Sequence, residues 1–301
     1  MLQPRIAVLM ATHNGERFLQ EQLDSIRAQQ QVSVTLIVSD DDSKDSTLEI
    51  IERFSADFPV QVLPSQRFGS AQANFYRLIR DAPLEGFDAI AFADQDDIWS
   101  IDRLAKTVAA LEHADAVSSN VTAVFSTRRV LVEKNQPQRR FDFVCESAGP
   151  GSTYLLTREA FEFVQQVVRG DQRVNDTAAH DWTVYAICRA AGLRWVILPD
   201  SLVEYRQHDR NATGANLGPR QAIARARALR NGWHRMQSLR VARIALDVAT
   251  KELQPELRGL VQLFEQTTPS ARLQLAARVP QLRRRRRDQL ALRTAILSGN
   301  W

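Results

Sequence analysis

The sequence predicts an α/β fold with a mostly parallel sheet, followed by a mainly helical C-terminal region. Two observations support this prediction. Through the first half of the chain, short apolar runs rich in Val and Ile alternate with segments whose apolar residues recur at helical spacing. From residue 221 onward the pattern is helical, with much Ala, Leu and Arg. Alternation of this kind is typical of βαβ units, in which crossover helices join parallel strands.

The predicted elements follow the chain in order. Strands are expected at 5–10, 34–39, 59–63 and 87–93, and helices between them at 16–29, 45–54 and 70–82. The next elements are a helix at 101–114, one or two strands at 115–125, and a polar loop at 133–150 beside the site. Helices at 158–168 and 181–192 precede strand-like runs at 194–199 and 201–206. Gly192 is placed to cap the helix before it, and the C-terminal helices should break near 267–270 and at Pro280.

Charge divides the chain into two regions. Residues 1–219 hold 22 Lys and Arg against 30 Asp and Glu, whereas residues 220–301 hold 17 against 5. The excess of positive charge in the second region favours an anionic partner or surface. No stretch approaches the roughly 20 apolar residues of a membrane span, and the N-terminus lacks a secretory signal pattern. Two cysteines without metal-type spacing fit a reduced compartment, so we expect a cytoplasmic protein, at most peripheral to a membrane.

Three polar clusters follow predicted strands: ATHNGE at 11–16, SDDDSKDS at 39–46 and DQDDIW at 94–99. In an open α/β sheet, ligands bind beyond the carboxyl ends of the strands, and parallel strands bring these ends to one edge. Aspartates also cap helices, so one acidic loop alone would be weak evidence. Three loops that converge predict a ligand site.

The segments VLMATHNGERFLQEQLDSIRAQ, LIVSDDDSKDSTLEII and FADQDDIWSIDRL resemble the inverting glycosyltransferases of family 2. The likeness is strongest to the bacterial rhamnosyl- and related transferases that build surface polysaccharides such as O-antigen. It continues through GSTYLLTREAFE, HDWTVYAICRAAG and LVEYRQHDRNATGAN. The resemblance implies a GT-A catalytic domain at 1–216, with a basic, mainly helical region at 217–301.

For the acidic cluster, the resemblance implies a nucleotide-sugar donor and a divalent cation, Mg²⁺ or Mn²⁺. Asp94 would accept a hydrogen bond from the donor's ribose, and Asp96 would bind the cation that bridges the diphosphate. Asp97 would cap the following helix or support Asp96. His208 would complete the metal site or touch the diphosphate, and Arg206 and Arg210 would contact phosphate oxygens.

In the first two loops, the resemblance places Thr12, His13 and Asn14 around the base and ribose. Asp40 would accept the imino proton of uracil or thymine, which allows a UDP- or dTDP-sugar, with dTDP-rhamnose one candidate. Asp41 would support the loop. The family usually has Gly where this chain has Asp42, and Asp is tolerated at some cost if that position needs a positive φ.

Asp181, in HDW, matches the family's catalytic base, which deprotonates the acceptor hydroxyl before attack on the anomeric carbon. The alternative is a plain helix cap. Trp182 would wall the sugar pocket or lie in the core. The acceptor would be a glycan or a lipid-linked saccharide of cell-surface polysaccharide synthesis.

Two rival functions stay open: a nucleotidyltransferase that makes sugar nucleotides, and a non-catalytic binding protein on a degenerate transferase fold. The first usually carries a Gly-rich loop ending in Thr-Arg, which MATHNGERF lacks. The run Arg283–Arg287 has three interpretations: a packed or solvated helix face, peripheral contact with the anionic inner membrane, or nucleic-acid binding. The last is the least favoured because the region has few aromatic residues.

Overall fold

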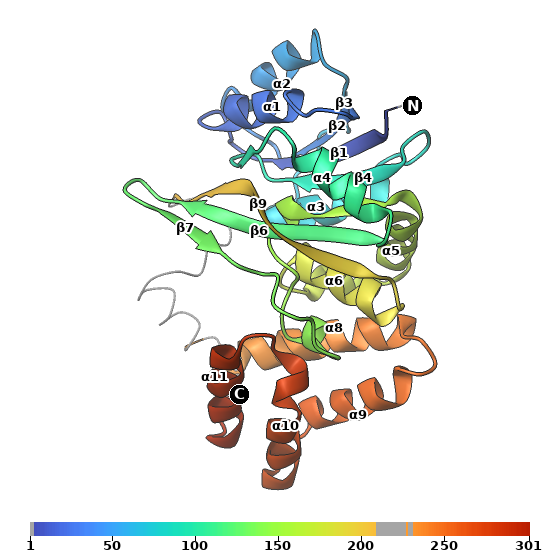
Figure 1. Cartoon of the computed structure of the whole chain (residues 1–301), viewed down its shortest axis with the longest axis vertical. Helices are drawn as coiled ribbons and strands as arrows, with labels where there is room; N and C mark the ends of the chain where they lie inside the picture. The colour runs from blue at the N-terminus through green and yellow to red at the C-terminus, as the bar shows by residue number, and fades with distance from the viewer. Residues whose placement is uncertain (1–2, 209–226, 228–230) are drawn as a thin grey trace. The chain divides into compact units, whose positions relative to one another are not determined.

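The computed structural model describes residues 3–208, 227 and 231–301, and it divides into two compact units (Figure 1). Unit 1 consists of residues 1–134, 149–170 and 193–215, and unit 2 of residues 135–148, 171–192 and 216–301. The chain therefore passes from one unit to the other repeatedly. The boundary that the sequence predicts between residues 216 and 217 lies outside the described residues.

Unit 1 is built on one sheet with a parallel core. Its strands are β1 (Arg5–Thr12), β2 (Ser33–Asp40), β3 (Val60–Val62), β4 (Ala89–Ala93), β5 (Ile98–Trp99), β6 (Ala116–Val124), β7 (Arg129–Val132), β8 (Leu155–Thr157) and β9 (Trp195–Arg206). They lie in the order β3-β2-β1-β4-β8-β6-β9-β5, with β7 paired to β6. Strands β3, β2, β1 and β4 are parallel, as are β6 and β9, whereas β5, β7 and β8 pair antiparallel. The predicted α/β class with crossover helices is confirmed.

Burial explains why the central strands read as continuous apolar runs. Every residue from Ile6 to Met10 in β1 is fully buried, as expected for a parallel strand covered on both faces. One face of β1 shares a core cluster with Leu19, Leu23 and Ile26, which repeat at helical spacing on α1. The helices of unit 1 are α1 (Leu19–Arg27), α2 (Thr47–Ser55), α3 (Ala71–Asp81), α4 (Arg103–Leu111) and α5 (Arg158–Gly170).

Unit 2 is helical. It contains α6 (His180–Ala190), α8 (Trp233–Val248), α9 (Gln254–Glu265), α10 (Pro269–Leu282) and α11 (Arg286–Leu297), with short 3₁₀ turns at Asp142–Val144 and Gln172–Asp176. Gly192 follows α6 with φ +81°, the left-handed conformation predicted for a C-terminal cap. In the described part of the chain, no helix is both long and apolar enough to span a membrane.

Two local predictions need correction. Residues 133–150 form a loop, as predicted, but it is not polar throughout, because Phe141, Phe143 and Val144 are buried and their 3₁₀ turn packs with α6, α8 and α10. Pro280 does not end α10, which continues to Leu282. A proline at this position leaves the carbonyl of Ala276, four residues earlier, without its helical donor. The Nε–H of Arg293, on α11, donates to that carbonyl at 3.2 Å and compensates for the loss.

Candidate functional site

The first two polar loops meet at the carboxyl edge of the parallel core. In the β1–β2 ladder Thr12 lies opposite Asp40, and the β1–β4 ladder pairs Met10 with Ala93, the residue before Asp94. The hydroxyl of Thr12 donates to the Asp40 carboxylate at 2.7 Å. The parallel register therefore brings the ends of β1, β2 and β4 to one edge, as the pattern of the loops predicts.

Asp40 and Asp41 are both buried and both hydrogen-bonded. Asp40 accepts from the hydroxyl of Ser43 at 2.6 Å and from its backbone N–H at 2.8 Å, besides the bond from Thr12. The carboxylate of Asp41 accepts from the backbone N–H groups of Phe68 and Gly69. Asp40 thus fixes its own loop, and Asp41 ties that loop to the segment before α3.

His13, Asn14 and Asp42 complete this part of the edge. Asn14 has φ +46° and Asp42 has φ +57°, so Asp42 does occupy the left-handed conformation that suits glycine. Its carboxylate pairs with the Lys44 ammonium at 2.6 Å, and that hydrogen bond lowers the pKa of Asp42. His13 bonds through Nδ1 to the carbonyl oxygen of Asp41 at 2.6 Å, and Asn14 lies against His13 Nε2 at 3.0 Å.

Gln95 joins the first loop to the third. Its side-chain oxygen accepts from the N–H of His13 at 2.9 Å, and its amide donates to the His13 carbonyl at 3.0 Å. A Cβ at Gly15 would lie only 2.3 Å from that side-chain oxygen, so the bridge requires glycine there. Sequence reasoning missed Gln95. The sequence contains both the NG motif and the DQD motif, but it does not show that these two motifs lie in contact in the folded protein.

Asp96 and His208, the two residues predicted to bind a cation, lie in contact with each other. His208 Nε2 lies 2.8 Å from the Asp96 carboxylate, and both side chains are 15% exposed. The ring of Phe18 stacks on His208 at 4.9 Å. Among the described residues no group of three His, Cys, Asp or Glu side chains gathers as a ready-made metal site. The carboxylate of Asp96 is the kind of ligand that Mg²⁺ takes, together with substrate phosphates and water, whereas the imidazole of His208 is more typical of Zn²⁺.

Asp97 lies beneath the loop. It is fully buried, and burial, followed by the charges of Asp94 and Asp96, raises its pKa well above the usual range. Its carboxylate accepts from the backbone N–H of Arg206 at 3.3 Å. It does not cap α4, whose N-cap is Asp102, so that interpretation is wrong.

Arg103 is a second feature that the sequence did not reveal. Its side chain is fully buried, stacks on the Trp99 ring at 3.5 Å, and donates to the carbonyl of Ser152 at 2.7 Å. Burial lowers its pKa to about 9, while the charge of Asp97 opposes that shift. Asp97 therefore has a buried cation close enough to interact with its charge. In sequence, Arg103 resembles any basic residue at a helix start.

Arg206 braces the same loop from β9. Its Nε–H donates to the carbonyl of Asp96 at 3.0 Å, and Nη2 donates to Glu21 at 2.9 Å. Its guanidinium also lies 4.6 Å from the centre of the Phe18 ring. Arg206 thus holds the loop in place, and Arg210 lies outside the described residues.

Asp181 and Trp182 belong to unit 2, whereas the residues predicted to bind the donor and the cation belong to unit 1. Asp181 is half-buried in the first turn of α6, and its carboxylate accepts from the N–H of Trp182 at 2.6 Å. The helix begins at His180 with Ala179 as its N-cap, so Asp181 is not a plain cap. Trp182 is buried in unit 2, where its indole N–H donates to the carbonyl of Phe143 at 2.8 Å.

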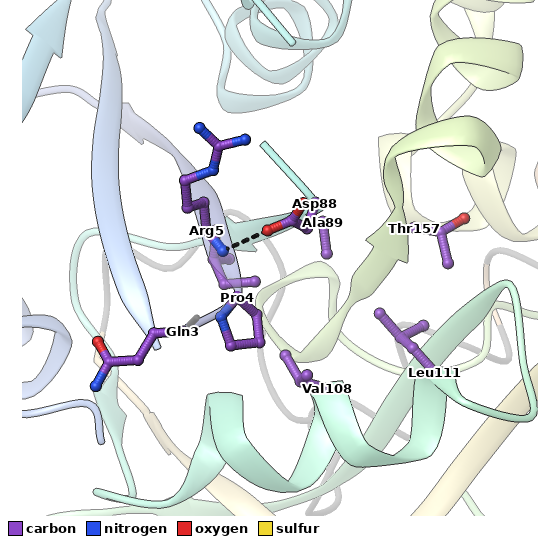
Figure 2. Close-up of a pocket in the computed structure, with 9 residues that line it drawn as sticks. Gln3, Pro4, Arg5, Asp88, Ala89, Val108, Leu111 and Thr157 are labelled. Carbon is purple, nitrogen blue, oxygen red and sulfur yellow. Dashed lines mark hydrogen bonds between the residues drawn. The ribbon is translucent and has the colours of Figure 1, made fainter. Parts of the chain in front are cut away.

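A separate pocket lies at the other end of β1. It has a volume of about 670 Å³ and is lined by Pro4, Arg5, Asp88, Val108 and Leu111, among others (Figure 2). The backbone N–H of Arg5 donates to the carboxylate of Asp88, which also lines the pocket, at 2.7 Å (Figure 2). Because Arg5 and Thr12 are the opposite ends of one strand, this pocket is not part of the edge that carries the acidic loops.

Comparison with known proteins settles the family. Residues 7–169 match the model of glycosyl transferase family 2. The chain belongs to glycosyltransferase family 2. This transferase is 40% identical over 245 residues to dTDP-rhamnosyl transferase RfbG of Shigella flexneri. The alignment covers 79% of this chain and 85% of that protein. It is 32% identical over 111 residues to the putative glycosyltransferase EpsE of Bacillus subtilis, covering 36% and 39%.

Solved structures of low sequence identity share the fold of the transferase. TarS 1–349 of S. aureus in complex with UDP-GlcNAc aligns with a TM-score of 0.57 at 15% identity, over 98% of this chain and 89% of that one. The mannosyltransferase PcManGT of Pyrobaculum calidifontis, in complex with GDP-Man and Mn²⁺, aligns with a TM-score of 0.57 at 19% identity, over 99% and 86%. The transferase therefore has the GT-A fold that the sequence motifs predict.

Proposed function

We propose that this glycosyltransferase moves a sugar from a UDP- or dTDP-sugar to a glycan or lipid-linked acceptor in cell-surface polysaccharide synthesis. The observation that carries the proposal is the convergence of Asp40, Asp94 and the Asp96–His208 pair on one edge of the parallel sheet. The likeness to a dTDP-rhamnosyl transferase makes dTDP-rhamnose the first donor to test. We place the reaction in the cytoplasm.

On the donor side, Thr12, His13 and Asn14 line the base and ribose, and Asp40 accepts a hydrogen bond from the imino N–H of the pyrimidine. Asp40 is held by Thr12 and Ser43, so its orientation is set before the donor arrives. Asp41 keeps the neighbouring segment in place through Phe68 and Gly69. Asp94 accepts a hydrogen bond from the ribose. Side chains that are held in place before the donor binds lower the entropy cost of binding.

Asp96 and His208 would hold Mg²⁺ or Mn²⁺. When bound, the ion neutralises charge that develops on the leaving nucleoside diphosphate. His208 has a second role that needs only the chain itself: its ring is clamped between Phe18 and Asp96 and keeps the carboxylate in one orientation. Arg206 holds the backbone of Asp96 from the other side.

Asp181 is the proposed base. Its carboxylate takes the proton of the acceptor hydroxyl, whose oxygen then attacks the anomeric carbon opposite the leaving diphosphate and inverts its configuration. The first turn of α6 orients the side chain through the N–H of Trp182, and burial of Trp182 fixes that turn.

The proposal is tested with the full chain and a panel of dTDP-rhamnose, UDP-sugars and GDP-mannose, with Mn²⁺, Mg²⁺ or EDTA. We expect tight binding and slow release of nucleoside diphosphate for one dTDP- or UDP-sugar with metal present, and for none with EDTA. GDP-mannose serves as the control for base recognition. Formation of nucleotide sugar from a sugar phosphate would instead indicate a nucleotidyltransferase, and no donor binding at all would indicate a non-catalytic protein.

A further inference from the structure

Helix α11 of unit 2 has two faces of different chemistry. Leu292 and Ile296, four residues apart, are buried at 2% and 1% exposure and pack the helix onto its unit. A second face, beside the buried one, carries Arg286, Leu290, Arg293 and Leu297, at positions i, i+4, i+7 and i+11. These four side chains are all exposed, Leu290 at 68% and Leu297 at 49%. We call this face the Arg–Leu stripe.

A further exposed leucine lies at one end of the stripe. Helices α10 and α11 pack against each other. A Cβ added to Gly299 would lie only 2.6 Å from the guanidinium of Arg272. The beginning of α10 is therefore next to the end of α11. Leu273, 64% exposed, thus sits at the same end of the helix pair as Leu297. Exposed leucines gathered beside arginines are unusual for a surface that meets only water.

The arginines of this region divide into inward and outward groups. Arg284 is buried beside Asp142 and Glu146, and Arg283 donates to the carbonyl of Cys145, so two of the five arginines at 283–287 serve the interior of unit 2. Arg286 and Arg287 are exposed, and so is Arg293, although its Nε–H donates to the carbonyl of Ala276 on α10. Residues 269–301 contain eight arginines and a single acidic residue, Asp288. The outward face is thus cationic and apolar at once.

We propose that the Arg–Leu stripe, with Leu273 and Arg287 beside it, docks on a bilayer of anionic phospholipid. An amphipathic helix of this composition lies in the interface, with leucines entering the acyl boundary and arginines on lipid phosphates. Its charge is complementary to the anionic leaflet, where each basic residue strengthens binding about fivefold. Nucleic acid would satisfy the arginines but leave Leu290 and Leu297 in water. The inference does not depend on the identity of the donor or acceptor.

The test measures sedimentation of the full chain with two kinds of phosphatidylcholine vesicle. One kind is made with about 30% phosphatidylglycerol, which is anionic, and the other contains no phosphatidylglycerol. We expect binding to the anionic vesicles at low salt that weakens as salt is added. Arg286→Gln/Arg287→Gln should weaken binding by about 25-fold, at roughly fivefold for each arginine. Leu290→Gln/Leu297→Gln should weaken it by about tenfold or more, because the apolar area no longer leaves water, while the salt dependence stays unchanged.

A matched control removes two exposed arginines of unit 1, as Arg53→Gln/Arg194→Gln, and should stay within about twofold of wild type. Circular dichroism establishes that each variant is folded. Wild type that fails to bind anionic vesicles at low salt overturns the proposal. So do stripe variants that bind like wild type, or equally tight binding of single-stranded DNA that the leucine changes do not affect.

Discussion

The change Arg284→Met tests whether the arginine run is structural or a surface feature. Arg284 is 3% exposed, with Nε 3.6 Å from the Asp142 carboxylate and Nη2 3.5 Å from Glu146. It also donates to the carbonyl of Ser147. Asp142 is itself fully buried and keeps a second partner, Arg189, at 3.2 Å. Removing one partner of a buried pair costs about 3–5 kcal/mol, and the retained Arg189 argues for the lower end, about 3 kcal/mol.

Urea unfolding of the full chain measures this loss. With a slope of about 2 kcal/mol per molar urea, 3 kcal/mol corresponds to a midpoint lower by about 1.5 M. Arg286→Gln is the matched control, because Arg286 is two residues away and exposed, and its midpoint should move by less than about 0.3 M. If the urea midpoint of Arg284→Met lies within about 0.3 M of the wild-type midpoint, the change has only the effect of a surface substitution and the reasoning is refuted.

The same variant has a defined pH dependence. Burial raises the pKa of Asp142, and the charges of Arg189 and Arg284 oppose that rise, so the variant should raise it further. A carboxyl whose pKa is higher in the folded state binds more protons there than when unfolded, so its stability contribution falls as pH rises through that window. The difference in free energy of unfolding between wild type and variant should therefore be small near pH 4, close to the usual carboxyl pKa. It should grow as the pH rises towards neutral.

Two further predictions concern the proposed chemistry. Asp96→Ala should weaken donor binding measured by calorimetry in Mn²⁺ but not in EDTA, and equal affinities across a metal titration would remove Asp96 from the cation site. Asp181→Asn should lower kcat at least about a hundredfold with donor affinity within a few fold, because shape is kept and the base is lost. A variant that loses thermal stability but keeps its turnover would make Asp181 a structural residue.

The sequence predicted the parallel core well because its strands are buried on both faces and read as unbroken apolar runs. The position of Thr12 opposite Asp40 follows from that prediction, since parallel strands put their ends at one edge. The turn around Phe143 was missed because the polar residues before it mask a short apolar run. Pro280 was misjudged because its compensation comes from Arg293 on another helix. Gln95 could not be found because its role exists only where two loops meet.

The segments that form unit 2 are synthesised far apart in time. The turn at Asp142–Val144 and helix α6 bury their apolar side chains against α8 and α10, which are among the last parts synthesised. At about 5–20 residues per second, the chain from Gly192 to Trp301 takes about 5–20 s to emerge. During this interval Phe141, Phe143 and Trp182 lack the partners that cover them. A nascent chain of this enzyme is thus a natural client for chaperones, and a fragment ended near residue 216 would keep that exposed surface permanently.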